Sequence, residues 1–345
     1  RCALGMHISI APTNSPRLPM SHLPVIVGFG GINAAGRSSF HHGYRRLVLD
    51  AIPETLRQQT LADLANLMRL GGHNAHGTAQ LAAVHGAHIR KHTLIRRIEE
   101  QYFDVDAVAT QRRLHAEHAD MRFNLKIRDL PQSIPPHWNI RRLDTSMAEV
   151  RLSHSQEFLI PDQYPSLVSS AGQLPTGFDL EQLYPARQHP RALQMTVFGA
   201  SDALHSMGYD WEELIKHVAP DRIGVFAASG HGQLDDYGVG GMLKLPWQGK
   251  RTTSKNCPLG FAQMPADFIN AYILGSTGAT GGVLGACATF LYNLERAVID
   301  IQAGRIDFAL VGAAEAPITP EVIEGYRTMG ALAEDAALLE LDKNR

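Results

Sequence analysis

The run GGVLGACATF at residues 281–290 decides how this chain folds. Small and apolar residues lead up to Cys287, and we expect residues 282–286 to form a buried strand that ends at this cysteine. Apolar residues then recur at helical spacing and stop at Gly304, where glycine allows a left-handed helix end. Residues 308–312 (FALVG) have the composition of another buried strand. The apolar stripe of the helix consists of Leu291, Leu294, Val298 and Ile301.

Segments upstream continue this alternation of strands and helices. Residues 223–228 (IGVFAA) predict a buried strand, and residues 265–274 predict a helix with a proline in its first turn. An apolar face over residues 192–204 predicts another helix, which Gly208 closes. Because the connections are short, we expect an α/β fold whose sheet is mostly parallel and covered on both faces. Further expectations are a short buried strand at residues 24–28 and helices near residues 56–70 and 78–118.

The overall composition excludes several classes of protein. With 345 residues, of which 44% are apolar and 19% charged, the chain resembles a soluble globular enzyme. Its formal net charge of −2 gives no overall field that would attract nucleic acid or anionic lipid. The cysteines Cys2, Cys257 and Cys287 form no CxxC pair, which argues against a disulfide framework or a zinc site. This cysteine usage suits the reducing cytoplasm.

One stretch imitates a membrane span, because residues 268–294 carry no charge and are long enough to cross a bilayer. Five glycines and several polar residues interrupt it, however. A lipid-facing helix would not tolerate that load, whereas a segment buried on both faces inside a protein would. We therefore predict no membrane span.

The position of Cys287 suits a nucleophile. At the start of a helix, the first N–H groups and the helix dipole would stabilise a thiolate. The same amide groups could donate to the oxyanion that forms when a thioester carbonyl is attacked. The small neighbours Gly285, Ala286 and Ala288 leave room for an acyl chain. A buried, inert cysteine in a core turn is the competing interpretation, and the spacing alone leaves both open.

The residues around Cys287 resemble those of a known family. VLGACAT at residues 283–289 is similar to the nucleophile motif of β-ketoacyl-acyl-carrier-protein synthases, and VGAAEAPITP at residues 311–320 is similar to that family's next strand and turn. DRIGVF at residues 221–226 with Ser229-Gly230 matches an earlier strand and its glycine turn. The resemblance extends over residues 189–335, and residues 27–37 suggest a divergent bacterial branch.

This resemblance implies a fold and a division of the chain. The fold would be the first half of a thiolase-like αβαβα layered domain, with a mainly helical insertion after the first strand. Residues 1–20 would be a non-native or disordered extension, and residues 21–345 the N-terminal half of the synthase domain. Within that half, residues 37–185 would form the insertion and residues 186–335 the core.

The resemblance also implies a decarboxylative Claisen condensation in fatty-acid biosynthesis. Cys287 would take an acyl group from an acyl-CoA or acyl-carrier-protein primer, and malonyl-carrier protein would lose carbon dioxide and attack the acyl-enzyme. The partners would be the acyl carrier protein and a second copy of the chain, joined in a homodimer through a strand near residues 281–286. No cofactor is implied. The family's two catalytic histidines and its second oxyanion donor would lie beyond Arg345, so the fragment alone would be inactive.

Three residues correspond by spacing to the acyl pocket of the family. They are Val322, Tyr326 and His231. A valine and a tyrosine stand where long-chain synthases often have glycine and phenylalanine. Each change makes the pocket smaller or more polar, and a long alkyl chain would lose burial worth about 0.8 kcal/mol per methylene. We therefore expect a short acyl primer, unless the backbone shifts to compensate.

Two other functions compete with the synthase interpretation. A non-catalytic partner of the chain-length-factor type would keep the fold, but such partners usually lose the nucleophile that is present here as Cys287. A thiolase would also use a cysteine, although the motif around Cys287 matches the synthases better.

Other patterns are weaker. Gly28, Gly30 and Asp50 imitate a dinucleotide fingerprint, but Asn33 stands where its third glycine belongs. A histidine row shares one predicted helical face without a cysteine or carboxylate beside it, so a solvated face is favoured over a metal site. A nearby basic stretch fits helix surface better than carrier-protein docking. The histidines are His85, His88 and His92, and the basic residues are Arg90, Lys91, Arg96 and Arg97.

Overall fold

The protein divides into two compact units, each made of segments that are distant in the sequence. The first unit is formed by Arg1–Arg96 with Ala171–Thr319, and the second by Arg97–Ser170 with Pro320–Arg345. The chain passes between them within β3 (Ile95–Arg97), within β9 (Ser170–Gly172), and again between Thr319 and Pro320. The structure, a computed structural model, describes residues 23–70, 77–117, 120–152 and 155–343.

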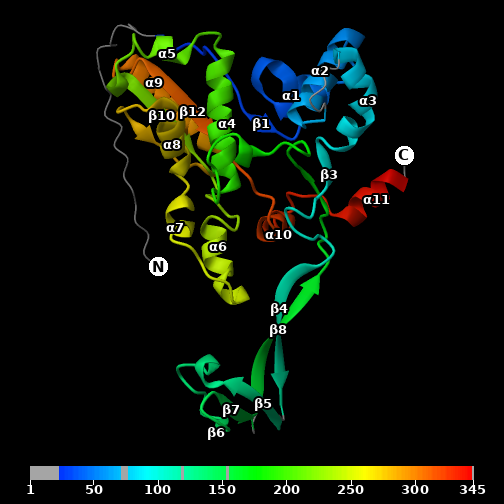
Figure 1. The fold of residues 1–345 in the computed structure, drawn as a ribbon. Helices are drawn as coiled ribbons and strands as arrows, with labels where there is room; N and C mark the ends of the chain where they lie inside the picture. Colours follow the sequence, from blue (N-terminus) through cyan, green and yellow to red (C-terminus); the bar gives the residue numbers. More distant parts are fainter. Residues whose placement is uncertain (1–22, 71–76, 118–119, 153–154, 344–345) are drawn as a thin grey trace, which may run out of the picture. The chain divides into compact units, whose positions relative to one another are not determined.

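A three-stranded parallel sheet forms the core of the first unit (Figure 1). Its central strand is β10 (Ile223–Ala228), in which all six residues are buried. β12 (Phe308–Ala313) pairs along the whole of β10, and β11 (Thr280–Gly281) pairs with its middle. The predicted parallel arrangement is therefore confirmed.

Helices cover both faces of this sheet. Successive residues of a strand point to opposite faces, so neighbouring residues of β10 contact different helices. Val225 packs in a cluster with residues of α4 (Arg191–Ser206) and α8 (Met264–Ile269). Phe226, the next residue, packs on the other side against Ala297 of α9 (Thr289–Gln302). Full burial of one such side chain contributes about 1.5–3 kcal/mol.

The first unit also contains a helical segment with a core of its own. α2 (Glu54–Leu67) and α3 (Thr78–Lys91) pack together, with Ala65 and Ile89 fully buried between them. The remaining elements of this unit are α1 (His42–Leu47), α5 (Trp211–Leu214), α6 (Val239–Lys244), α7 (Asn256–Leu259), and the short strands β1 (Ile32–Asn33) and β2 (Gly36–Arg37).

A buried carboxylate ties the early glycine-rich turn to α4. The side chain of Asp202 accepts hydrogen bonds from the Gly31 amide (3.0 Å), Arg37 Nε (2.8 Å) and Ser39 Oγ (2.8 Å). Only 1% of the Asp202 side chain is exposed. The arginine and these donors satisfy a charge that would otherwise be costly to bury.

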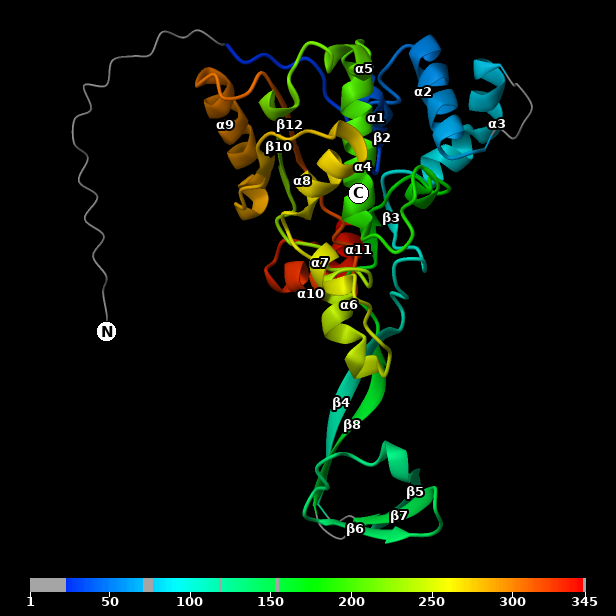
Figure 2. The same ribbon diagram turned by 60° about the vertical axis from the view of Figure 1, so that its left-hand side comes forward.

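The second unit is a long β-hairpin that carries a small sheet at its end (Figure 1 and Figure 2). Strands β4 (Val108–Ala116) and β8 (Gln156–Tyr164) pair antiparallel over nine residues each. β5 (Met121–Lys126), β7 (Met147–Leu152) and β6 (Trp138–Arg142) form the three-stranded antiparallel sheet that we name the tip sheet. Its small core contains Val150 and Leu152, both 0% exposed.

Two helices from the end of the chain belong to the second unit. They are α10 (Pro320–Thr328) and α11 (Asp335–Lys343). The Asp335 amide donates to the Leu167 carbonyl (2.9 Å), and the Ser169 amide donates to the Asp335 carboxylate (3.1 Å). The start of α11 is thereby attached to a segment that precedes it by more than a hundred residues.

Three expectations about these elements are wrong. The insertion at residues 37–185 is helical only up to Lys91, and strands follow from Ile95 onward. The predicted helix over residues 78–118 ends at Lys91, and Leu94, in the turn that follows, has a left-handed φ of 65°. Residues 24–28 form no strand, and Ile26 is 84% exposed.

The expected strand at residues 282–286 is also absent; only Thr280–Gly281 pair. The reason is that the amide side chain of Asn293 binds the backbone of Val283 in place of a neighbouring strand.

The expected extension at residues 1–20 lies outside the described residues. Within the described part of the chain, no helix combines the length and the apolar character needed to cross a membrane.

Candidate active site

Cys287 lies in a tight turn immediately before α9. The turn is the 3₁₀ helix η7 (Ala286–Ala288), and the cysteine side chain is exposed. Ala286 has a left-handed φ of 48°, an uncommon conformation for a residue with a Cβ. A Cβ on Gly285 would lie 2.1 Å from the Tyr292 ring, so a side chain at this position would require that ring to move. The backbone is thus constrained on the N-terminal side of the thiol.

Side chains from the first turns of α9 hold this approach to Cys287. The Gly285 amide donates to Thr289 Oγ1 (3.1 Å), and Thr289 Oγ1 donates to the Ala286 carbonyl (2.7 Å). Asn293, which is 0% exposed, accepts from the Val283 amide (2.9 Å) and donates to the Val283 carbonyl (3.0 Å). Sequence reasoning did not assign a role to Thr289 or Asn293. The available signal was their polar character inside a run without charges.

A second group of polar side chains lies at the carboxyl ends of β10 and β12. The Glu315 carboxylate accepts hydrogen bonds from the Gly230 amide and from Ser229 Oγ (3.1 Å), and it pairs with His231 Nδ1 (3.0 Å). A Cβ on Gly230 would lie 3.0 Å from the Ala286 carbonyl oxygen. The loop that carries this network therefore packs against the turn that carries Cys287.

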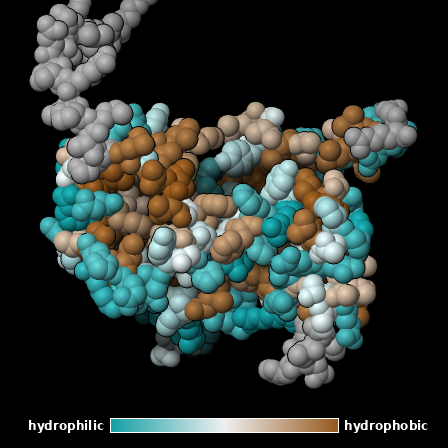
Figure 3. All heavy atoms as spheres, turned by 90° about the horizontal axis from the view of Figure 1, so that it is seen from above, coloured by the Kyte–Doolittle hydropathy of each residue, from teal (hydrophilic) through white to brown (hydrophobic). Residues whose placement is uncertain are grey.

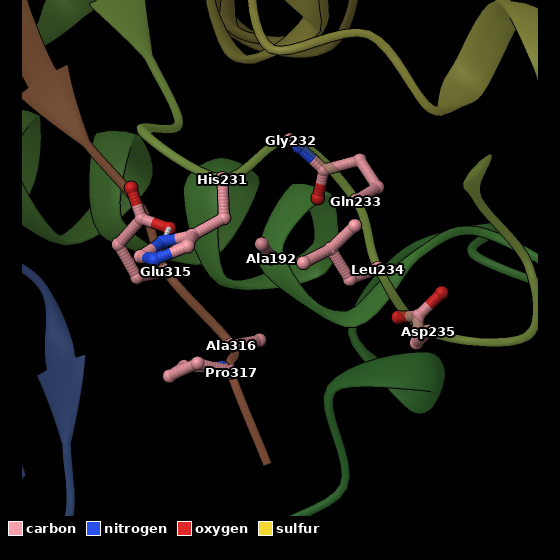
Figure 4. A pocket seen from close by; sticks show the side chains of 9 residues that line it. All are labelled: Ala192, His231, Gly232, Gln233, Leu234, Asp235, Glu315, Ala316 and Pro317. Carbon is pink, nitrogen blue, oxygen red and sulfur yellow. Dashed lines mark hydrogen bonds and ion pairs between the residues drawn. The ribbon is translucent and has the colours of Figure 1, made fainter. Parts of the chain in front are cut away.

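The same loop lines a shallow, open pocket (Figure 4). Gln233 is 1% exposed, and its side-chain amide has no hydrogen-bond partner among the described residues. Burial raises the pKa of Asp235, although its carboxylate accepts hydrogen bonds from the Arg191 and Tyr237 amides. The lining residues are Ala192, His231, Gly232, Gln233, Leu234, Asp235, Glu315, Ala316 and Pro317.

The predicted pocket residues fall into different units. His231 lines the pocket of the first unit, together with Glu315. Val322 and Tyr326 belong to α10 of the second unit, one helical turn apart; Val322 is buried and Tyr326 half-buried. Their role in an acyl pocket stays a prediction.

Apolar side chains reach the surface in clusters rather than singly (Figure 3). One group of them adjoins the candidate nucleophile, on the turn before it and on the first turn of α9. Such a surface is typical of an interface rather than of a solvated face. Its exposed members are Val283, Leu284, Phe290, Leu291 and Tyr292.

Two histidines of the helical segment lie against each other on α3 and just after it. His88 and His92 stack their rings at a centroid distance of 4.1 Å. Among the residues that the structure describes, no group of three or more histidine, cysteine or acidic side chains could hold a metal ion.

The arrangement can support covalent acyl transfer. An exposed thiol precedes a 14-residue helix, which presents its first N–H groups at that end. The backbone on one side is fixed by Thr289 and Asn293, and on the other the glycine turn at Gly230 approaches closely. A parallel α/β fold with an exposed thiol at the start of a helix is an arrangement that suits an acyltransferase with a cysteine nucleophile.

The chain belongs to the β-ketoacyl synthase family. The family described as "Beta-ketoacyl synthase, N-terminal domain" matches residues 139–342. The β-ketoacyl-acyl-carrier-protein synthase FabY of Pseudomonas aeruginosa is 47% identical over 333 residues, which cover 92% of this chain and 52% of the relative. The 3-oxoacyl-acyl-carrier-protein synthase 2 of Staphylococcus aureus is 28% identical over 175 residues, which cover 50% of this chain and 42% of that protein.

A solved structure agrees with these relatives. The crystal structure of the ketosynthase FabY from Pseudomonas aeruginosa superposes with a TM-score of 0.89 at 44% identity, and it covers 96% of this chain and 54% of that one. The fold is therefore the thiolase-like α/β fold, as the sequence predicted. The chain spans about half the length of these relatives.

Proposed function

We propose that this chain is the nucleophile-bearing part of a β-ketoacyl-acyl-carrier-protein synthase of fatty-acid biosynthesis. The observation that carries the proposal is the exposed thiol of Cys287 at the start of α9, behind a backbone held by Thr289 and Asn293. A retained nucleophile in a constrained turn argues against a non-catalytic partner subunit.

The reaction begins with transfer of an acyl group to the enzyme. The Cys287 thiolate attacks the carbonyl of an acyl thioester and a tetrahedral oxyanion forms. The oxyanion collapses to the acyl-cysteine as the carbon–sulfur bond to the carrier breaks, and the carrier leaves as its thiolate. Amide groups at the start of α9 stabilise that oxyanion. Malonyl-carrier protein then loses carbon dioxide, and the resulting carbanion attacks the acyl-cysteine. The product is a 3-ketoacyl-carrier protein, and the Cys287 thiolate is regenerated.

The partners follow from this chemistry. The primer arrives as an acyl-CoA or an acyl-carrier protein, and the extender as malonyl-carrier protein. Two copies of the chain form a dimer in the cytoplasm, and the exposed apolar residues next to Cys287 supply part of their interface.

The acyl group is short. Val322 and Tyr326 stand where long-chain synthases often have glycine and phenylalanine, so they add bulk and a hydroxyl at those two positions. By the same correspondence His231, whose imidazole pairs with Glu315, adds a polar group. A hydroxyl or imidazole in an acyl pocket disfavours a long alkyl chain, which gains free energy only where it meets apolar surface.

Acylation measured by intact-protein mass spectrometry tests the proposal. The full-length protein is incubated with acetyl, octanoyl and palmitoyl thioesters, and we expect a mass gain that is fastest for acetyl. Cys287→Ser should abolish the thioester adduct, whereas the matched variant Cys257→Ser should retain it, since Cys257 is also exposed. An adduct that persists in Cys287→Ser would refute the nucleophile. Faster loading of palmitoyl than of acetyl would refute the short-chain assignment, and Val322→Gly should shift the preference toward longer chains.

A further inference from the structure

The tip sheet of the second unit has two faces of opposite character. Its register pairs Phe123 with Val150 and Ile140 with Val150, so these apolar residues share the inner face. Residues one position away point to the other side. We name that side the outer face; its members on the three strands are Arg122, Asn124, Lys126, Asn139, Arg141, Met147, Glu149 and Arg151.

Positive charge dominates the outer face. The face carries four cationic side chains and one carboxylate, that of Glu149. The cationic residues are Arg122, Lys126, Arg141 and Arg151. All four cationic residues are exposed. The whole chain, by contrast, has a formal net charge of −2, so this face differs in sign from the protein that carries it.

The ion pairs on this face leave two cations without a counter-charge. Arg141 pairs with Glu149 (3.2 Å), and Arg151 pairs with Asp120 at the sheet's edge (3.1 Å). Arg122 and Lys126 form no ion pair with any residue that the structure describes.

The register places like charges directly opposite each other. Arg122 of β5 faces Arg151 of β7 across the two strands. Like charges in this position destabilise a sheet, so the fold gains nothing from the pair itself. An anionic surface laid over the face would satisfy both guanidinium groups at once, because each has several donors in a fixed plane.

We propose that the outer face of the tip sheet is a docking surface for the acyl carrier protein, an acidic protein. This inference rests on the proposed function, which makes that protein the donor of acyl and malonyl groups. Charge complementarity carries the assignment: a cationic face on a chain of negative net charge steers an acidic partner to one place.

A single-stranded nucleic acid fits the face less well. Such ligands are bound by aromatic side chains on which bases stack, combined with a basic groove. The uncharged members of the outer face are Asn124, Asn139 and Met147, and none is aromatic. The aromatic residues Phe123 and Trp138 lie on the inner face, in contact with each other.

Charge reversal on the full-length protein tests the docking surface. Affinity for the pantetheine-loaded carrier protein is measured for the wild type and for Arg122→Glu/Arg151→Glu at about 0.05 M and about 0.5 M salt. We expect the double variant to bind at least about tenfold more weakly at low salt and to match the wild type at high salt. The matched control is Arg113→Glu, on the hairpin strand β4, where Arg113 is exposed and pairs with Glu157. It should bind like the wild type.

Two results would overturn the proposal. One is equal affinity of the double variant and the wild type at low salt, with thermal unfolding unchanged. The other is a DNA oligonucleotide or an anionic vesicle that binds the wild type but not the double variant while the carrier protein binds both equally. Acylation of wild-type Cys287 by a small soluble thioester, which needs no docking, separates this inference from the proposed function. A chain that binds the carrier protein through the outer face but never acylates Cys287 would refute only the function.

Discussion

Asn293 shows how much the candidate nucleophile depends on a residue that touches no substrate. Its side-chain amide accepts a hydrogen bond from the backbone N–H of Val283 and donates one to the Val283 carbonyl. It also donates to the Thr289 carbonyl (2.7 Å). A glycine-rich approach to Cys287 would otherwise have many accessible conformations. The side chain thus replaces the ladder that a neighbouring strand would provide.

Replacement of this residue should affect both stability and acylation. In Asn293→Ala, two backbone groups of Val283 lose their partners, and we expect the free energy of unfolding to fall by about 2–3 kcal/mol. Acylation of Cys287 should slow in protein that remains folded. Urea unfolding measures the change in stability, and acylation reactions quenched at successive times measure the change in rate.

Gln302→Ala is the matched control, since it removes an exposed amide side chain from the same helix. It should leave stability and acylation nearly unchanged. If Asn293→Ala behaved like Gln302→Ala, the loop at Val283 would not depend on this amide.

At this scale the sequence was informative about Cys287 and silent about its supports. The position of Cys287 between a glycine-rich run and an amphipathic stretch follows from periodicity, whereas its role as the nucleophile was predicted from the resemblance to the synthase motif. The roles of Thr289 and Asn293 depend on the path of the preceding loop, which no periodicity reports. The pair of Glu315 and His231 joins loops 84 residues apart and was missed for the same reason.

Among the elements, α4 begins beside an aromatic cluster that encloses His189. The ring contacts Phe268 at a centroid distance of 5.1 Å and Tyr272 at 5.9 Å, and its Nδ1 lies 3.3 Å from the Tyr184 hydroxyl. Burial, and to a lesser extent the charge of Lys255, lowers the pKa of His189 below its ordinary value of 6.5. The folded protein therefore keeps this imidazole neutral.

The lowered pKa predicts a pH dependence of stability. The unfolded chain binds the proton more readily than the folded one, so the free energy of unfolding should decrease as the pH falls below 6.5 toward the folded value. The contribution of His189 is fully present above pH 6.5. The free energy of unfolding, measured with urea between about pH 5 and 8, should change less with pH in His189→Phe than in the wild type. Identical slopes would contradict the assignment.

The amphipathic helix α9 and the fully buried strand β10 were predicted well, whereas several other elements were not. The apolar stripe of α9 and the six buried residues of β10 carry a strong periodic or compositional signal. Residues 24–28 have the same composition as a buried strand, yet Val25 is 71% exposed, because composition does not say whether a partner strand exists. β4 was taken for helix, since its exposed face gives no apolar alternation.

At the scale of the whole molecule, the exposed apolar residues beside Cys287 predict self-association. Leu291 is 61% exposed on α9, next to Phe290 and Tyr292. Sedimentation should show a dimer at micromolar concentration, and Leu291→Glu should shift it toward the monomer, because a carboxylate would be buried without a partner.

The matched control for this prediction is Leu243→Glu, on α6, where the leucine is 63% exposed. It should remain dimeric. A wild-type protein that sediments as a monomer would contradict the interface.

The division into two units could not be predicted from the sequence. Resemblance to the family covered residues 189–335 as one continuous core, yet the contacts within the chain assign Pro320 onward to the unit of the hairpin. The hydrogen bonds that attach Asp335 to Leu167 and Ser169 connect segments that no local pattern relates.

These same hydrogen bonds have a consequence for folding during synthesis. The hairpin and the tip sheet leave the ribosome early, but α10 and α11 follow only after Thr319. At about 5–20 residues per second, the intervening stretch from Ala171 to Thr319 takes about 7–30 s to translate. During that interval the Leu167 carbonyl and the Ser169 amide lack the hydrogen-bond partners that the start of α11 supplies, so this part of the second unit is completed only when the last residues have been synthesised.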